Sequence, residues 1–143
     1  RLLKYDPHSA GGIMTTNILQ IGPERPVAEA LRVYQTQEDA PDFAYYFFVV
    51  DEAGRLAGVL SMRQVLIAAD GAIVRNVMTR ELVTVAPDDE PQHVAETIAE
   101  YNLLAIPVVD EDQRFVGAIT VDDVLDVLLK ESWRRGRSRG FGG

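Results

Sequence analysis

Carboxylates gather at the start of the last helix that the sequence predicts. Asp123 and Asp122 precede Asp126 by three and four residues, a spacing that places them near Asp126 on adjoining faces of one helix. Mg²⁺ binds oxygen ligands and keeps several waters, so one or two carboxylates from each of two facing surfaces suffice to hold it. First-turn acids also favour the helix dipole, although Asp126 lies beyond that turn. Divalent-cation binding therefore stands beside this structural explanation, with Glu131 as a more distant ligand.

Thr120 and Asp123 have the spacing of a helix capping box, in which a hydroxyl and a carboxylate each accept a backbone N–H. A strand that ends at a helix N-terminus also presents free N–H groups to a phosphate. The pattern predicts a cap and leaves a nucleotide-binding role in addition to it open. Ser61 and Gln64 repeat this spacing with a neutral glutamine, which can still cap the helix.

The composition excludes several classes of function. The 143 residues include no cysteine, and no nucleophile elbow, dinucleotide fingerprint or phosphate loop occurs, so we expect no enzyme. The net charge is −8, and the four arginines of residues 134–143 conceal a charge of −12 on residues 1–133. An acidic surface repels nucleic acid, which is not an expected partner, and can attract cations. The longest apolar run, residues 43–50, is far shorter than the ~20 residues of a membrane span.

The chain contains an internal repeat, which must position these residues. Met14-Thr15 recurs 64 residues later as Met78-Thr79, and Val49-Val50-Asp51-Glu52 recurs 59 residues later as Val108-Val109-Asp110-Glu111. The second offset continues through Arg55/Arg114, Gly58/Gly117, Ser61/Thr120 and Val65/Val124. The molecule is therefore read as two copies of one unit of roughly sixty residues.

Each copy predicts the element order β-α-β-β-α, an α/β (α+β) fold. A short strand (18–21; 82–85) precedes a helix with apolar residues at helical spacing (27–34; 94–101). A hairpin follows (45–50 with 56–60; 105–109 with 115–119), and a last helix begins at Ser61 or Thr120. One such unit buries too little surface to be stable alone, so we expect two units packed about a pseudo-twofold axis. The predicted bounds are a linker (1–10), the first unit (11–72), the second unit (73–131) and a flexible basic tail (132–143).

These repeats resemble a tandem pair of CBS domains, because each unit opens near Met-Thr and closes with Val-Val-Asp, a glycine, and a Ser or Thr before a helix. Two stretches narrow the resemblance to the cytosolic CBS region of MgtE-type magnesium transporters. They are Ser9-Ala10-Gly11-Gly12-Ile13-Met14-Thr15-Thr16 and Thr120-Val121-Asp122-Asp123-Val124-Leu125-Asp126-Val127.

The resemblance implies a regulatory module without catalysis that forms a homodimer through its CBS units. In such transporters the pair lies at the cytoplasmic face of the membrane, between an acidic amino-terminal domain and the transmembrane domain of the same chain. Mg²⁺ bound between these domains closes the pore, which implies a metal site at Asp122, Asp123, Asp126 and Glu131. The segment after the last helix departs from the family, because it turns basic at Trp133-Arg134-Arg135.

CBS pairs also bind adenine nucleotides such as ATP or AMP, which gives an alternative function as a nucleotide sensor that regulates another enzyme or channel. The resemblance places Thr120 on phosphate and Asp123 on the ribose, with Thr79, Leu82 and Ile106 near the base. Gln64 is a weaker ribose acceptor than an acid, so we expect a single nucleotide site at Asp123. A purely structural dimerisation module is the third possibility.

Overall fold

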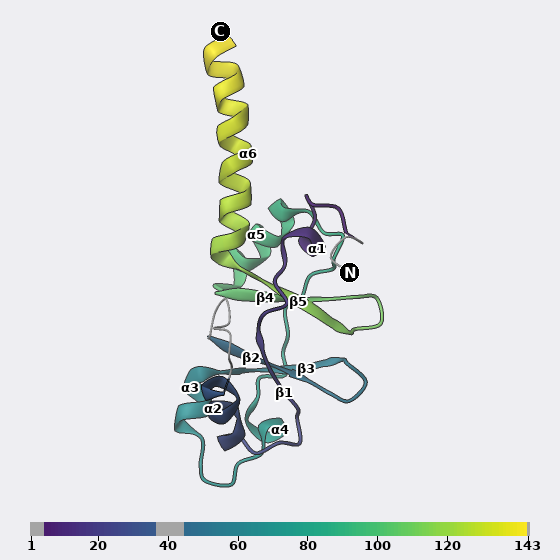
Figure 1. The fold of residues 1–143 in the computed structure, drawn as a ribbon, viewed down its shortest axis with the longest axis vertical. Helices are drawn as coiled ribbons and strands as arrows, with labels where there is room; N and C mark the ends of the chain where they lie inside the picture. Colours follow the sequence, from purple (N-terminus) through teal and green to yellow (C-terminus); the bar gives the residue numbers. More distant parts are fainter. Residues whose placement is uncertain (1–4, 37–44, 143) are drawn as a thin grey trace.

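The computed structural model describes the backbone of residues 5–36 and 45–142, and the side chains of residues 5–36 and 45–133. Short helices and strands alternate along the chain, and one long helix ends it (Figure 1). In chain order the elements are α1 Ala10–Ile13, β1 Leu19–Ile21, α2 Ala28–Gln35, β2 Tyr46–Val50, β3 Leu56–Ser61, α3 Met62–Ile67, α4 Val74–Val77, α5 Pro91–Tyr101, β4 Ala105–Val109, β5 Phe115–Thr120 and α6 Val121–Gly142. The predicted α+β fold of two similar units is confirmed.

The two units contain unequal sheets. In the first unit β1 pairs in parallel with β2, and β2 pairs antiparallel with β3. In the second unit only β4 and β5 form a sheet. The strand predicted over residues 82–85 is therefore wrong, because only Val85 pairs there, in a parallel bridge with Val108. Pro107 takes the place of Phe48 in the facing strand, and proline has no N–H to donate to a neighbour.

The units are interlocked through their Met-Thr segments. Thr15 exchanges two backbone hydrogen bonds with Ala118 of β5 (2.8 and 3.0 Å), and Thr79 exchanges two with Val59 of β3 (2.8 and 3.0 Å). Each segment thus leaves its own unit and pairs with the sheet of the other. The helices that precede these segments cross over as well, since α1 lies with the second unit and α4 with the first (Figure 1).

This crossing gives each unit a core that contains a methionine from the other repeat. Met78 packs in the first core with Phe47 and Leu60, and Met14 packs in the second core with Ile106 and Ile119. A third cluster joins the units and contains Ile18, Phe48, Ala105 and Ala118, with Phe115 against it. Two units that are too small to be stable alone therefore share one interior.

The ends of the chain differ from the sequence prediction. Residues 5–9 of the predicted linker lead into α1, whose first N–H, on Ala10, donates to the carbonyl of Asp89 (2.8 Å). Residues 132–142, within the segment expected to be a flexible tail, are helical and extend α6 beyond the rest of the molecule (Figure 1). Extension adds a hydrogen bond per residue to a helix that is already nucleated, and arginine favours helix. In the described residues no helix is long and apolar enough to span a bilayer.

Candidate functional site

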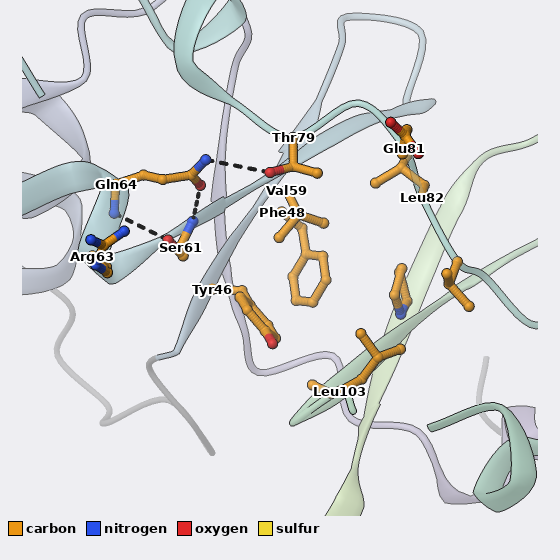
Figure 2. Close-up of a pocket in the computed structure, with 13 residues that line it drawn as sticks. Tyr46, Phe48, Val59, Ser61, Arg63, Gln64, Thr79, Glu81, Leu82 and Leu103 are labelled. Carbon is orange, nitrogen blue, oxygen red and sulfur yellow. Dashed lines mark hydrogen bonds between the residues drawn. The ribbon is translucent and has the colours of Figure 1, made fainter. Parts of the chain in front are cut away.

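A pocket of about 330 Å³ opens between the two units, which is within the size range of small-molecule sites. Its walls come from β2, β3, the start of α3, the segment after α4, and the start of β4. Aromatic and aliphatic side chains form most of the wall, and Figure 2 shows polar groups at one end. The lining residues are Tyr46, Phe48, Val59, Ser61, Arg63, Gln64, Thr79, Glu81, Leu82, Val83, Leu103, Ala105 and Pro107.

Gln64 closes the polar end of this pocket. Its N–H donates to Ser61 Oγ (3.1 Å) while its Oε1 accepts the N–H of Ser61 (2.8 Å), a complete capping box for α3. Its Nε2 also donates to Thr79 Oγ1 (3.3 Å), as Figure 2 shows. The same Nε2 donates to the carbonyl of Val77 (3.1 Å). The predicted capping role of Gln64 is therefore confirmed. The same side chain ties α3 to the segment that crosses between the units, which the sequence reasoning missed.

The five residues predicted for a nucleotide do not form one site. Thr79 and Leu82 line the pocket together with Ser61 and Gln64, whereas Thr120 and Asp123 are not among its lining residues. The reason is the crossing of the units, because Thr79 pairs with β3, which ends at Ser61, rather than with β5, which ends at Thr120. The first copy crosses in the same way, since β5 pairs with Thr15, the residue equivalent to Thr79.

Ile106, which was expected near a base, does not line this pocket. It is fully buried in the second core, while its neighbours Ala105 and Pro107 line the pocket. Successive side chains of a strand point to opposite faces, so a strand that presents residues 105 and 107 to the pocket turns residue 106 away. The strand that contains Ile106 therefore reaches the pocket through its two neighbours, and the role of Ile106 beside a base stays a prediction.

The start of α6 carries the predicted acids. Thr120 is 9% exposed, and its Oγ1 accepts the N–H of Asp123 (3.1 Å), which confirms the predicted helix cap. Asp122, Asp123 and Asp126 are exposed. These carboxylates are accessible to a partner surface, whereas the Thr120 hydroxyl is bonded to the N–H of Asp123.

Two acids of α6 have basic side chains near them. Asp126 Oδ2 lies 3.1 Å from Lys130 Nζ, one turn further along the helix. Glu131 Oε2 lies 3.8 Å from Nδ1 of His8 in the segment before α1. Within residues 5–36 and 45–133, no three side chains of His, Cys, Asp or Glu converge on a point that could hold a metal ion. In the described residues, α6 therefore presents exposed acids but not a complete set of metal ligands.

Comparison with known families identifies the class of protein to which this chain belongs. Residues 10–71 and 74–130 each match the CBS domain family. The chain belongs to the CBS domain family and contains two tandem copies of the domain.

Magnesium transporters are among the CBS proteins that the chain resembles. It is 40% identical over 131 residues to the magnesium transporter MgtE of Thermus thermophilus and 36% identical over 131 residues to that of Enterococcus faecalis. Both alignments cover 92% of this chain and 29% of the transporter, so the chain spans under a third of these relatives. A crystal structure of the cytosolic domain of the Mg²⁺ channel MgtE in complex with ATP superimposes with a TM-score of 0.84 at 40% identity, covering 88% of this chain and 51% of that one. The chain is homologous to the CBS region of MgtE.

Proposed function

We propose that this chain is the cytosolic, Mg²⁺-sensing CBS pair of an MgtE-like magnesium transporter, without enzymatic activity. The observation that carries the proposal is the exposed row of acids at the start of α6, in a chain that MgtE transporters match along 92% of its length. In this function the chain forms a homodimer through its CBS units at the cytoplasmic face of the membrane. An acidic amino-terminal domain and a transmembrane domain of the same parent are its neighbours.

The mechanism is electrostatic. Residues 1–133 have a net charge of −12, so a second acidic surface brought against α6 is repelled. Two unit charges 4 Å apart interact by roughly 1 kcal/mol in water and roughly 4 kcal/mol near a protein surface. Mg²⁺ shared between the surfaces replaces several such repulsions with attractions. Its loss lets the surfaces separate, and a difference of a few kcal/mol is enough to shift a two-state pore.

The test uses the parent protein, since the second surface lies outside this chain. Limited proteolysis is followed with and without millimolar Mg²⁺ in the wild type and in Asp122→Asn/Asp126→Asn. We expect Mg²⁺ to protect the wild type and the double variant to need about tenfold more Mg²⁺, as expected for the loss of roughly 1.4 kcal/mol of binding. The control is Glu96→Gln/Glu100→Gln, which removes the same charge from α5. Equal Mg²⁺ dependence in the two double variants would contradict a site on α6.

Adenine-nucleotide sensing is the second candidate, and the pocket in Figure 2 favours it. Leu82 and Phe48 offer apolar surface to an adenine ring, while Ser61, Arg63 and Thr79 offer donors to phosphate and ribose oxygens. The related MgtE cytosolic domain has been crystallised with ATP. Nucleotide binding to this pocket, in addition to cation sensing, would let the module report two signals.

Isothermal titration with ATP distinguishes binding in the pocket from binding at the start of α6. In Leu82→Glu a charge enters the apolar wall, so binding in the pocket should fall at least tenfold, while Asp123→Ala should leave it unchanged. The reverse result would place ATP beside Thr120 and contradict binding in the pocket. If the wild type does not bind ATP at millimolar concentration, nucleotide sensing fails, whereas the Mg²⁺ proposal stands or falls on proteolysis alone.

A further inference from the structure

The two hairpins of the molecule meet at a pair of arginines. Arg55 follows the turn of the first hairpin, and Arg114 follows the turn of the second, at equivalent positions of the repeat. The two residues form an antiparallel bridge. The N–H of Leu56 donates to the carbonyl of Gln113 (3.2 Å), and the N–H of Phe115 donates to the carbonyl of Gly54 (2.9 Å).

This bonding pattern brings the arginine side chains together. The hydrogen bonds flank the pair rather than joining its members, which defines the closer of the two antiparallel pair types, with Cα atoms roughly 4.5 Å apart and side chains on one face. Both arginines are exposed. Two like charges directly opposite each other destabilise a ladder, so the pair needs a reason other than the stability of the empty protein.

The two nearest acids of the hairpin turns accept backbone N–H groups through one carboxylate oxygen each. Asp51 Oδ1 accepts the N–H groups of Ala53 and Arg55 (both 2.9 Å), and Asp110 Oδ1 accepts those of Asp112 (2.9 Å) and Arg114 (3.0 Å). These carboxylates thus bind backbone groups of their own turns. Three other cations of the described region lie in ion pairs, Arg25–Glu29, Arg75–Glu24 and Lys130–Asp126. Neither guanidinium of the hairpin pair has an ion pair within residues 5–36 and 45–133.

We propose that Arg55 and Arg114 form a binding site for a phosphate group at the junction of the two hairpins. Each guanidinium presents paired N–H donors that match two oxygens of one anion, and a phosphate dianion balances both charges. Because the arginines are related by the repeat, a ligand between them meets equivalent donors from both units. The hairpin turns lie on the side of the molecule away from α3 and the start of α6, so this site is separate from the pocket (Figure 1).

Phosphate at this site would also hold the units together. The ligand bridges one arginine from each unit, at a junction that otherwise contains two backbone hydrogen bonds and like charges. A ligand that binds the folded state alone raises the free energy of unfolding by RT ln(1 + [ligand]/Kd), so the melting temperature should rise with phosphate. The site is independent of the proposed Mg²⁺ function and can be tested on this chain.

The experiment compares melting temperatures in sodium phosphate and in sodium chloride at equal ionic strength. The melting temperature of the wild type should rise with the logarithm of the inorganic phosphate concentration once this exceeds Kd. The single variants Arg55→Gln and Arg114→Gln should need at least tenfold more phosphate for the same rise, and the double variant should not respond. In chloride the double variant should melt at or above the wild-type temperature, because its like-charge contact is gone. The control is Arg32→Gln, an exposed cation of α2, which should respond as the wild type does.

A second measurement locates the effect. In ¹H–¹⁵N spectra, phosphate should shift the amide signals of Gly54, Arg55, Gln113 and Arg114 with one common saturation curve. An equal gain in melting temperature for the wild type and the double variant would overturn the proposal. So would amide shifts that grow linearly with phosphate and persist in the double variant, since these indicate general screening.

Discussion

Gly58 is a position where one methyl group would disturb the interlock of the units. A Cβ atom there would lie 2.6 Å from Met78 Sδ, 2.9 Å from Met78 Cγ and 2.8 Å from the carbonyl oxygen of Thr79. The methionine can move, but the carbonyl is held, because it accepts the N–H of Val59 at 3.0 Å. We therefore expect Gly58→Ala to force β3 and the Met78-Thr79 segment apart.

The size of this effect follows from three contributions. Overpacking of a core costs about 1–3 kcal/mol, and weakening one backbone hydrogen bond adds about 1 kcal/mol. The alanine returns about 0.4–1 kcal/mol by restricting the unfolded chain. The free energy of unfolding should fall by about 2 kcal/mol, which lowers the melting temperature of a domain of this size by roughly 4–8 °C.

Calorimetry of the wild type and three variants checks the reasoning. Gly117→Ala should behave as Gly58→Ala does, because its Cβ would lie 2.7 Å from Met14 Sδ and 2.9 Å from the Thr15 carbonyl. Gly22→Ala is the control, since its Cβ meets only Arg25 Cγ at 3.4 Å and should change stability by less than about 0.5 kcal/mol. The units should unfold in one transition. Two separate transitions, or a Gly58→Ala loss no larger than the Gly22→Ala change, would refute the interlock.

Three further predictions address other contacts. Hydrogen bonds from the Arg25 guanidinium, together with its charge, hold the pKa of Glu29 below its ordinary value. The ion pair therefore stabilises the protein above that ordinary pKa and loses its effect as pH falls through the lowered one. Melting curves of the wild type and Glu29→Gln should differ slightly at neutral pH and converge in acid or high salt. Phe115→Ala removes a ring stacked on Phe48 with centroids 5.0 Å apart. The free energy of unfolding from urea titrations should fall by about 2–4 kcal/mol, and an unchanged value would contradict this expectation. Gln64→Asp keeps an acceptor for the Ser61 N–H but loses the donors to Val77 and Thr79. It should lower the urea midpoint by the equivalent of about 1–2 kcal/mol. An unchanged midpoint would show that these hydrogen bonds between α3 and the crossing segment do not contribute to stability.

The repeat allowed most of the fold to be predicted from the sequence. Helices α2 and α5, both hairpins and the starts of α3 and α6 follow from apolar spacing and turn residues, which act locally. Helices α1 and α4 were missed because each has four residues, too few for a periodic pattern. Gly11 and Gly12 also disfavour helix. The N–H of Gly11 donates to the carbonyl of Pro87 at 2.7 Å, a contact with the other repeat that no local pattern contains.

The candidate site was predictable only in its parts. The capping residues Ser61 and Thr120 were found because a cap depends on residues three positions apart. The grouping of Thr79 with Ser61 was not found, because it depends on which sheet the crossing segment joins. The face of β4 on which Ile106 lies could not be predicted either, because burial on both sides of β4 removes the alternation that would reveal it. The metal assignment of the α6 acids stays a prediction.

The differences between the copies give the two halves of the module different chemistry within one frame. Where the second copy has Asp123, exposed at the start of α6, the first has Gln64, whose amide is bonded to its own cap and to the crossing segment. A ligand at the first position must compete with these bonds or leave them in place, whereas a cation at the second meets a free carboxylate. Arg55 and Arg114, in contrast, are the same in both copies and face each other. A ligand that contacts residues identical in both copies should therefore bind at the hairpins. Ligands that contact residues differing between the copies should bind at the pocket and at α6.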